Sequence, residues 1–127
     1  MYAGAKDDDC CHNVVLLDKE THGYLPVPYD FDFSGLVNAS YASPNPKLPI
    51  KRVTRRLYRG MCEHNGQLDA AVNLFREKET AIRELVGSIE NLDDGMRDQA
   101  LRFIERYFQD TATPEGVDRY LVRTCGS

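Results

Sequence analysis

With 127 residues, of which 42% are hydrophobic and 28% charged, the chain has the size and composition of one globular domain or of a piece of a larger one. Its net charge of −4 excludes a general nucleic-acid binder, because neutralising phosphates requires a broad basic surface. No apolar run approaches the roughly 20 residues that span a bilayer, and residues 1–9 lack the apolar segment of a secretory signal. We therefore expect neither nucleic acid nor a membrane as a partner, while the compartment stays undecided.

The first half of the chain predicts a flexible start, a β-hairpin and a long loop. Residues 1–9 are expected to be flexible because three consecutive acids repel one another there. Two apolar segments, joined by a polar turn that ends in Gly23, predict a hairpin over residues 10–35. Pro26 and Pro28 each remove a backbone donor, which confines the second strand to an edge or a bulge. Residues 36–50 form a connection of a length that is uncommon unless it is functional.

Residues 51–127 are expected to be helical. Ile50–Tyr58 fits a short helix, and a long amphipathic helix is predicted from Gly66 onward. Asp93 or Asp94 is the expected cap of the next helix, and Thr113-Pro114-Glu115 is a typical start of the last one. The long predicted helix is marked by apolar residues three or four positions apart: Leu68, Val72, Phe75, Ile82, Leu85, Val86 and Ile89. The fold prediction for residues 1–127 is a single α+β domain, a hairpin packed on about four helices.

The four cysteines are too few for a disulfide scaffold. Cys10 and Cys11 are adjacent in a predicted strand, where side chains alternate, so only one of them can face the core. A disulfide from one of these to Cys62 or Cys125 would suit an exported protein. Buried free thiols are the alternative, and the sequence does not decide between the two.

Asp30 and Asp32 are the strongest candidates for chemistry. In an extended segment, residues two apart face the same side, so both carboxylates can hold one hard cation such as Mg²⁺ or Mn²⁺. A structural alternative is that they cap turns around Ser34 and Gly35. Asn13, which precedes the first strand, would join them as an oxygen ligand if the hairpin brings its two outer ends together.

The order of these residues resembles that of protein-kinase-like folds. There, a catalytic Asp is followed five residues later by a metal-holding Asn, and a hairpin leads to a second metal-holding Asp. Asn13 and Asp30 match the ligand positions, whereas Asp8 matches the base position by count only, since Lys6 stands where those folds usually have His.

Three segments carry a more specific resemblance: CCHNVVLL, YLPVPYDFDFSGLVNASYA and LPIKRVTRRLYRGMC. They look like the C-terminal part of a bacterial family of unassigned function that is similar to the spore-coat CotH-type atypical kinases. The resemblance implies a kinase-like C-lobe with Asn13 and Asp30 as metal ligands and Asp32 as a secondary ligand. Complete relatives would transfer a phosphoryl group from ATP. Without a glycine-rich loop or a strand lysine, this chain is expected to be a fragment or reduced relative that is inactive alone.

Other interpretations of the same residues remain. Asp30, Asp32 and Ser34 satisfy the D-x-D-x-[ST] pattern of haloacid-dehalogenase-type phosphatases, although that fold needs a buried parallel strand before the motif. The basic residues between 51 and 59 include Arg56 and Arg59, our candidates for contacts with phosphate or with acidic groups. A solvated surface is the alternative for this strip. The cysteine and histidine spacings match no standard zinc site.

The leading hypothesis is thus a kinase-like fragment with a divalent-metal half-site. The competing hypothesis is a non-catalytic helical module that contacts a protein partner through the hairpin and the basic strip. The exposed edge of the hairpin could also pair with a second copy of the chain.

Overall fold

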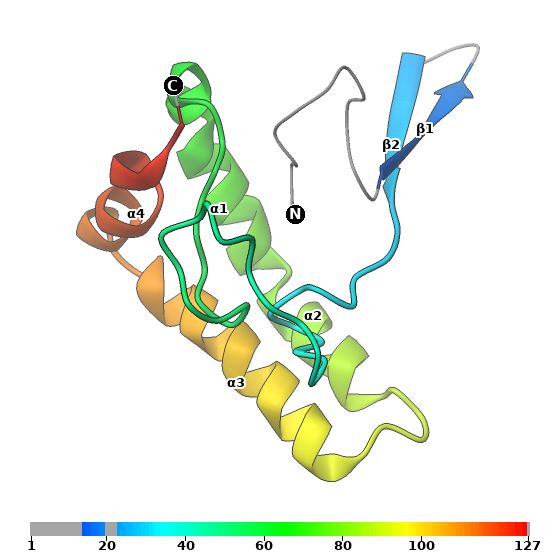
Figure 1. Cartoon of the computed structure of the whole chain (residues 1–127). Coiled ribbons are helices and arrows are strands. Elements are labelled where there is room, and N and C mark those ends of the chain that lie inside the picture. Colours follow the sequence, from blue (N-terminus) through cyan, green and yellow to red (C-terminus); the bar gives the residue numbers. More distant parts are fainter. Residues whose placement is uncertain (1–13, 20–22, 127) are drawn as a thin grey trace.

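The computed structural model of the chain describes residues 14–19 and 23–126. It combines one β-hairpin with four α-helices, which confirms the α+β composition (Figure 1). Among the described residues, no helix is both long and apolar enough to cross a membrane. The elements, in chain order, are β1 (Val14–Lys19), β2 (Gly23–Pro28), the 3₁₀ helix η1 (Cys62–Gln67), α1 (Leu68–Glu77), α2 (Glu79–Gly87), α3 (Asp94–Asp110), α4 (Pro114–Tyr120) and the 3₁₀ helix η2 (Val122–Thr124).

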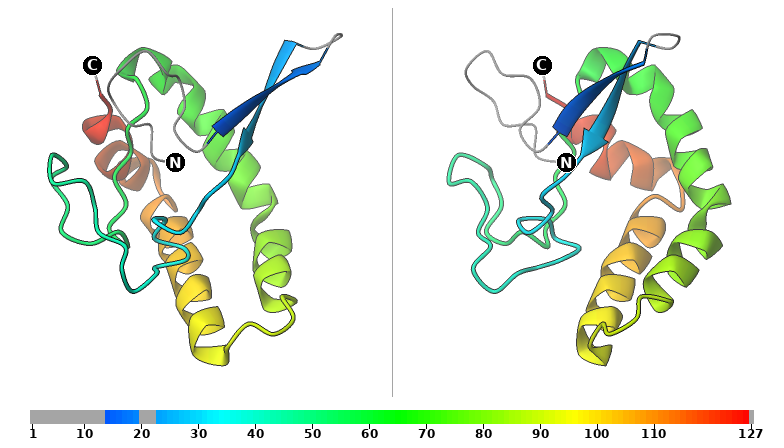
Figure 2. Two further views of the ribbon diagram at one scale, coloured as in Figure 1. Left: turned by 45° about the vertical axis from the view of Figure 1, so that its right-hand side comes forward. Right: turned by 90° about the vertical axis from the view of Figure 1, so that its right-hand side faces the viewer.

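The hairpin is antiparallel, with a register that runs from Val14 opposite Pro28 to Lys19 opposite Gly23. It stands clear of the helices in Figure 1, and Leu17 is 48% exposed. The expected packing of the hairpin on the helices is therefore not observed. Instead, the loop after β2 lies over α3 (Figures 1 and 2). Gly35 makes the closest approach, because a Cβ there would lie 2.5 Å from the carbonyl oxygen of Val53 and 2.7 Å from the Phe103 ring.

The long helix expected from Gly66 onward is divided into η1, α1 and α2. The break between α1 and α2 falls at Lys78, whose N–H is shared between the carbonyl oxygens of Leu74 and Phe75.

The two later helix starts were predicted correctly. The Asp93 side chain accepts a hydrogen bond from the Met96 N–H at 3.2 Å and caps α3. Thr113 caps α4 in the same way through the Gly116 N–H at 3.2 Å, with Pro114 in the first turn. Caps of this kind each stabilise a helix by about 1 kcal/mol.

The core lies along α3, which packs against α2 and also contacts α1 and α4. Thr111, which is only 1% exposed, donates to the Tyr107 carbonyl oxygen, and its own carbonyl accepts from Arg76. The polar atoms of this buried residue are therefore satisfied, which avoids the cost of an unpaired buried group. The buried apolar residues are Leu68, Val72, Val86, Ala100, Phe108 and Val117.

The helix expected over Ile50–Tyr58 is absent. The segment forms turns, of which one is closed by a hydrogen bond from the Arg55 N–H to the Arg52 carbonyl oxygen at 3.0 Å. A nine-residue helix is marginal in isolation, and β-branched Val53 and Thr54 lower its propensity further. Contacts with the 31–42 loop and with α3 therefore decide the conformation.

A disulfide joins the start of the helical part to the end of the chain. Cys62 is bonded to Cys125, with a Cα–Cα distance of 5.1 Å. Backbone hydrogen bonds extend the junction, from the Cys62 N–H to the Gly126 carbonyl and from the Gly126 N–H to the Gly60 carbonyl. Neither alternative that the sequence left open for Cys62 and Cys125 is observed, because they are bonded to each other and not to Cys10 or Cys11, which both lie outside the described residues.

Candidate functional site

The predicted metal site is only partly within the described structure. Asp8 and Asn13 lie outside the described residues, so their places relative to the aspartates are not established. Asp30 and Asp32 follow β2 directly, where the chain leaves the hairpin and turns toward α3 (Figure 1). The hairpin thus delivers the acidic pair to the junction between the strands and the loop.

The carboxyl groups of Asp30 and Asp32 meet. A hydrogen bond from Asp30 is the main reason why the pKa of Asp32 is lowered, and further hydrogen bonds from Tyr41 and from the Phe33 N–H act in the same direction. Asp30 has a φ of 56°, in the left-handed region, rather than the extended conformation assumed from the sequence. The two carboxyl groups are therefore brought together by a turn and not by strand alternation.

Tyr41 completes the immediate surroundings of Asp32. Its hydroxyl donates to Asp32 Oδ2 at 3.1 Å, while the Phe33 N–H donates to Oδ1 at 2.9 Å. The hydrogen bond to Asp32, followed by the negative charge of that carboxylate, raises the pKa of Tyr41 above its ordinary value. The rings of Phe33 and Tyr41 also meet edge to face, with their centroids 6.0 Å apart. Sequence reasoning missed Tyr41, since it lies nine residues beyond its partner in the loop.

A second set of contacts fixes the loop on α3. Gly35 fits between the Val53 carbonyl and the Phe103 ring, and Arg56 covers the same ring with its guanidinium 3.9 Å from the centroid. Arg56 also donates to the Phe103 carbonyl oxygen, and burial is the main cause that lowers its pKa. Arg56, a candidate for contact with phosphate or acidic groups, thus contacts an aromatic ring and a backbone carbonyl. Arg59, the other candidate, is exposed.

The acidic pair can hold a cation with two oxygen ligands from the described residues. No group of three or more His, Cys, Asp and Glu side chains that could hold a metal occurs in the described part of the chain. Any further protein ligand must therefore be of another type, such as the predicted amide of Asn13, or come from residues that the structure does not describe. Water or ligand oxygens would complete the shell, as is usual for Mg²⁺.

The setting of the D-x-D-x-S pattern differs from that of the dehalogenase-type phosphatases. The pattern follows β2, which is antiparallel to β1 in a two-stranded sheet. Residues 14–19 and 23–126 contain no parallel sheet that would place Asp30 at the end of a buried strand. The geometry therefore gives this alternative no support.

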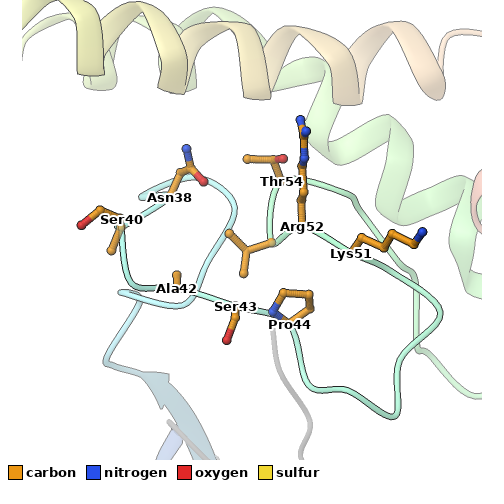
Figure 3. Close-up of a pocket in the computed structure, with 10 residues that line it drawn as sticks. Asn38, Ser40, Ala42, Ser43, Pro44, Lys51, Arg52 and Thr54 are labelled. Atoms are coloured by element: carbon orange, nitrogen blue, oxygen red, sulfur yellow. The ribbon is translucent and has the colours of Figure 1, made fainter.

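The loop that follows the acidic pair forms a depression of about 380 Å³, lined by residues 38–40, 42–44 and 51–54 (Figure 3). Tyr41, the partner of Asp32, lies in the same loop but does not line the depression. Lys51 and Arg52 supply the charge of residues 51–54. The basic strip was recognised in the sequence, but its position opposite residues 38–44 was not predicted.

Comparisons of the chain with protein-family models, with curated proteins and with solved structures found no match.

Proposed function

We propose that the chain binds one divalent cation, Mg²⁺ or Mn²⁺, through the carboxylates of Asp30 and Asp32. The observation that carries this proposal is that the two carboxyl groups meet at the exit of the hairpin. Two carboxylates this close repel when both are ionised, and either a shared proton or a cation relieves the repulsion. At neutral pH, where exposed carboxyl groups are ionised, a hard cation is the natural counter-charge.

The cation would serve phosphoryl transfer. In kinase-like proteins, oxygen ligands steer Mg²⁺ on the nucleotide phosphates, and catalysis rests on positioning and on charge stabilisation. The order of Asn13, hairpin and Asp30 agrees with that arrangement, and a loop anchored on a long helix follows Asp32. In this proposal Asn13 and Asp30 are the principal ligands, Asp32 is the supporting one, and Asp8 is the acceptor-side base. ATP would bind in a complete relative.

A titration of the chain with Mg²⁺ and then with Mn²⁺, followed by calorimetry, tests the proposal. We expect millimolar or tighter binding by the wild type, and a loss of at least about tenfold, or roughly 1.4 kcal/mol, in Asp30→Asn and Asp32→Asn. Asp98→Asn is the matched control, because Asp98 is an exposed aspartate on α3. Equal affinities in all four proteins, or no binding at millimolar metal, would refute the proposal.

A second function, self-association, is favoured by the position of the prolines in β2. In an antiparallel pair, alternate residues direct their N–H and C=O groups toward the partner strand or away from it. Pro26 and Pro28 occupy alternate positions and are compatible with pairing to β1 if they face outward, where they leave Tyr24 as the only residue of β2 that can donate from its free edge. The edge of β1, Val14–Lys19, is then the one able to accept a further strand.

A second copy of the chain is the occupant that we propose for this edge. Two β1 edges paired about a twofold axis would give a four-stranded sheet, which is more stable than an isolated hairpin. One usable edge per chain closes the assembly at a dimer. Light scattering should show a dimer that becomes a monomer in Leu16→Pro, which removes a donor from β1. A wild type that stays monomeric at high concentration would contradict this function.

A further inference from the structure

The depression in the loop after β2 has a lining suited to an anion. Its ten lining residues include two cations and four neutral side chains that can donate hydrogen bonds, and no carboxylate is among them. The volume of about 380 Å³ falls within the range of pockets that bind small molecules. The polar members are Asn38, Ser40, Ser43, Lys51, Arg52 and Thr54.

Figure 3 shows how the polar side chains are placed. Asn38 comes from one segment, and Arg52 and Thr54 come from the other; all three extend toward the side on which α3 lies. Ser40 and Ser43 extend elsewhere from the first segment, and the Lys51 side chain extends sideways, away from that of Arg52. Donors from two different parts of the loop thus share one side of the depression, with a guanidinium among them.

The two cations have no acidic partner within the described part of the chain, unlike three arginines of the helices. Arg83, Arg97 and Arg123 each have a carboxylate partner. Lys51 and Arg52 are exposed, and neither forms an ion pair with any residue in the described ranges. Their charge is therefore available to a ligand.

The backbone that carries these residues is held by local hydrogen bonds. The Asn38 N–H bonds to the Ser34 carbonyl at 2.9 Å, and the Arg55 N–H closes a turn on the Arg52 carbonyl at 3.0 Å. Gly35 packs against the carbonyl of Val53, which ties the two walls together. A site with a fixed backbone loses less entropy when it binds a ligand.

We propose that this depression binds the phosphate group of a small phosphomonoester. Two positive charges suit a dianion better than a single carboxylate, and the planar guanidinium of Arg52 can contact two phosphate oxygens at once. A volume of about 380 Å³ has room for a small phosphomonoester. This site stands independently of the cation site, because none of its lining residues is Asp30 or Asp32.

The test is a titration followed by amide chemical shifts, in EDTA and at constant ionic strength, with inorganic phosphate, glycerol phosphate and acetate in separate arms. We expect the amides of residues 38–44 and 51–54 to shift with both phosphates, at millimolar or lower concentration, and to respond at least about tenfold more weakly to acetate. Comparison of the phosphate and glycerol phosphate titrations shows whether the site binds a free phosphate ion or a phosphomonoester. A response to inorganic phosphate alone would overturn the assignment of the ligand.

Variants locate the site. Arg52→Gln and Lys51→Gln should each weaken binding of glycerol phosphate by about tenfold, since each removes a charge-assisted contact. Arg55→Gln is the matched control, because Arg55 is an exposed arginine of the same basic strip that does not line the depression. Asp30→Asn should leave phosphate binding intact, which separates this proposal from the cation site. An equal loss in Arg55→Gln, or shifts spread over all basic residues, would show nonspecific charge screening and overturn the proposal.

Discussion

Removal of the Cys62–Cys125 disulfide should strongly destabilise the helical part of the protein. The bond closes a loop whose ends are 63 residues apart in sequence. It joins the start of η1 to the residue after η2, so all four α-helices lie between its two ends. The double variant Cys62→Ser/Cys125→Ser removes the bond without leaving a thiol that can exchange with Cys10 or Cys11.

The expected magnitude follows from the loop length. In the chain-entropy treatment, a cross-link across 63 residues lowers the entropy of the unfolded chain enough to stabilise the fold by about 4 kcal/mol. This is a large share of the 5–15 kcal/mol that is typical of whole domains. The neighbouring backbone hydrogen bonds between Cys62, Gly60 and Gly126 would persist only in part once the covalent link is gone.

Urea denaturation followed by circular dichroism provides the assay. With a dependence on urea near 2 kcal/mol per molar, the midpoint of the double variant should fall by about 2 M. Wild-type protein treated with a reducing agent should show a similar shift, and peptide mapping should recover Cys62 joined to Cys125. A change in unfolding free energy below about 1 kcal/mol, or peptides in which these two cysteines are free, would refute the reasoning.

Two further predictions concern the loop on α3 and the hydrogen bond beside it. Gly35→Ala should lower the unfolding free energy by about 1–3 kcal/mol, because the new Cβ would lie 2.5 Å from the Val53 carbonyl oxygen, whereas Gly66→Ala, with no atom within 4 Å, should be near neutral. An equal effect of the two substitutions would contradict this account of the loop. Asp32→Asn should bring the Tyr41 pKa, followed by NMR of its ring, back down toward its ordinary value of 10.0. Because the folded pKa of Tyr41 is raised, its hydrogen bond stabilises the loop below pH 10 and is lost as the pH rises through that folded value. A Tyr41 titration that is unchanged by the substitution would contradict the bond.

The parts of the fold that depend on local chemistry were predictable from the sequence. The caps at Asp93 and Thr113 rest on side chains that reach only three residues along the chain, so the sequence contains the whole interaction. The hairpin follows from apolar strands and a glycine-containing turn, and its two strands are adjacent in sequence.

The parts that depend on distant contacts were not predictable in the same way. The pattern at Ile50–Tyr58 suits a helix, yet Gly35 and Arg56 draw this region onto Phe103, about 50 residues further along. The Cys62–Cys125 pair likewise depends on how the helices return the chain to its starting point. Hydrophobic spacing carries no information about such long-range contacts.

The candidate site shows the same division. The pairing of Asp30 with Asp32 was expected from their spacing, although a left-handed turn rather than an extended strand produces it. Tyr41 reaches Asp32 only because the loop folds back, which no local motif indicates. The proposed anion site could not be predicted for the same reason, because its lining combines residues of this loop with Lys51 and Arg52.

Paramagnetic broadening by Mn²⁺ tests the central claim most directly, because it reports where the cation sits as well as whether it binds. With Mn²⁺ well below the protein concentration, the ring signals of Phe33 and Tyr41 and the amides around Asp30 and Asp32 should broaden first, and Mg²⁺ should reverse the effect by competition. In Asp30→Asn this selective broadening should disappear, while in the Asp98→Asn control it should remain. Broadening that is spread over the acidic surface, or that is unchanged in Asp30→Asn, would contradict a divalent-cation site at the exit of the hairpin.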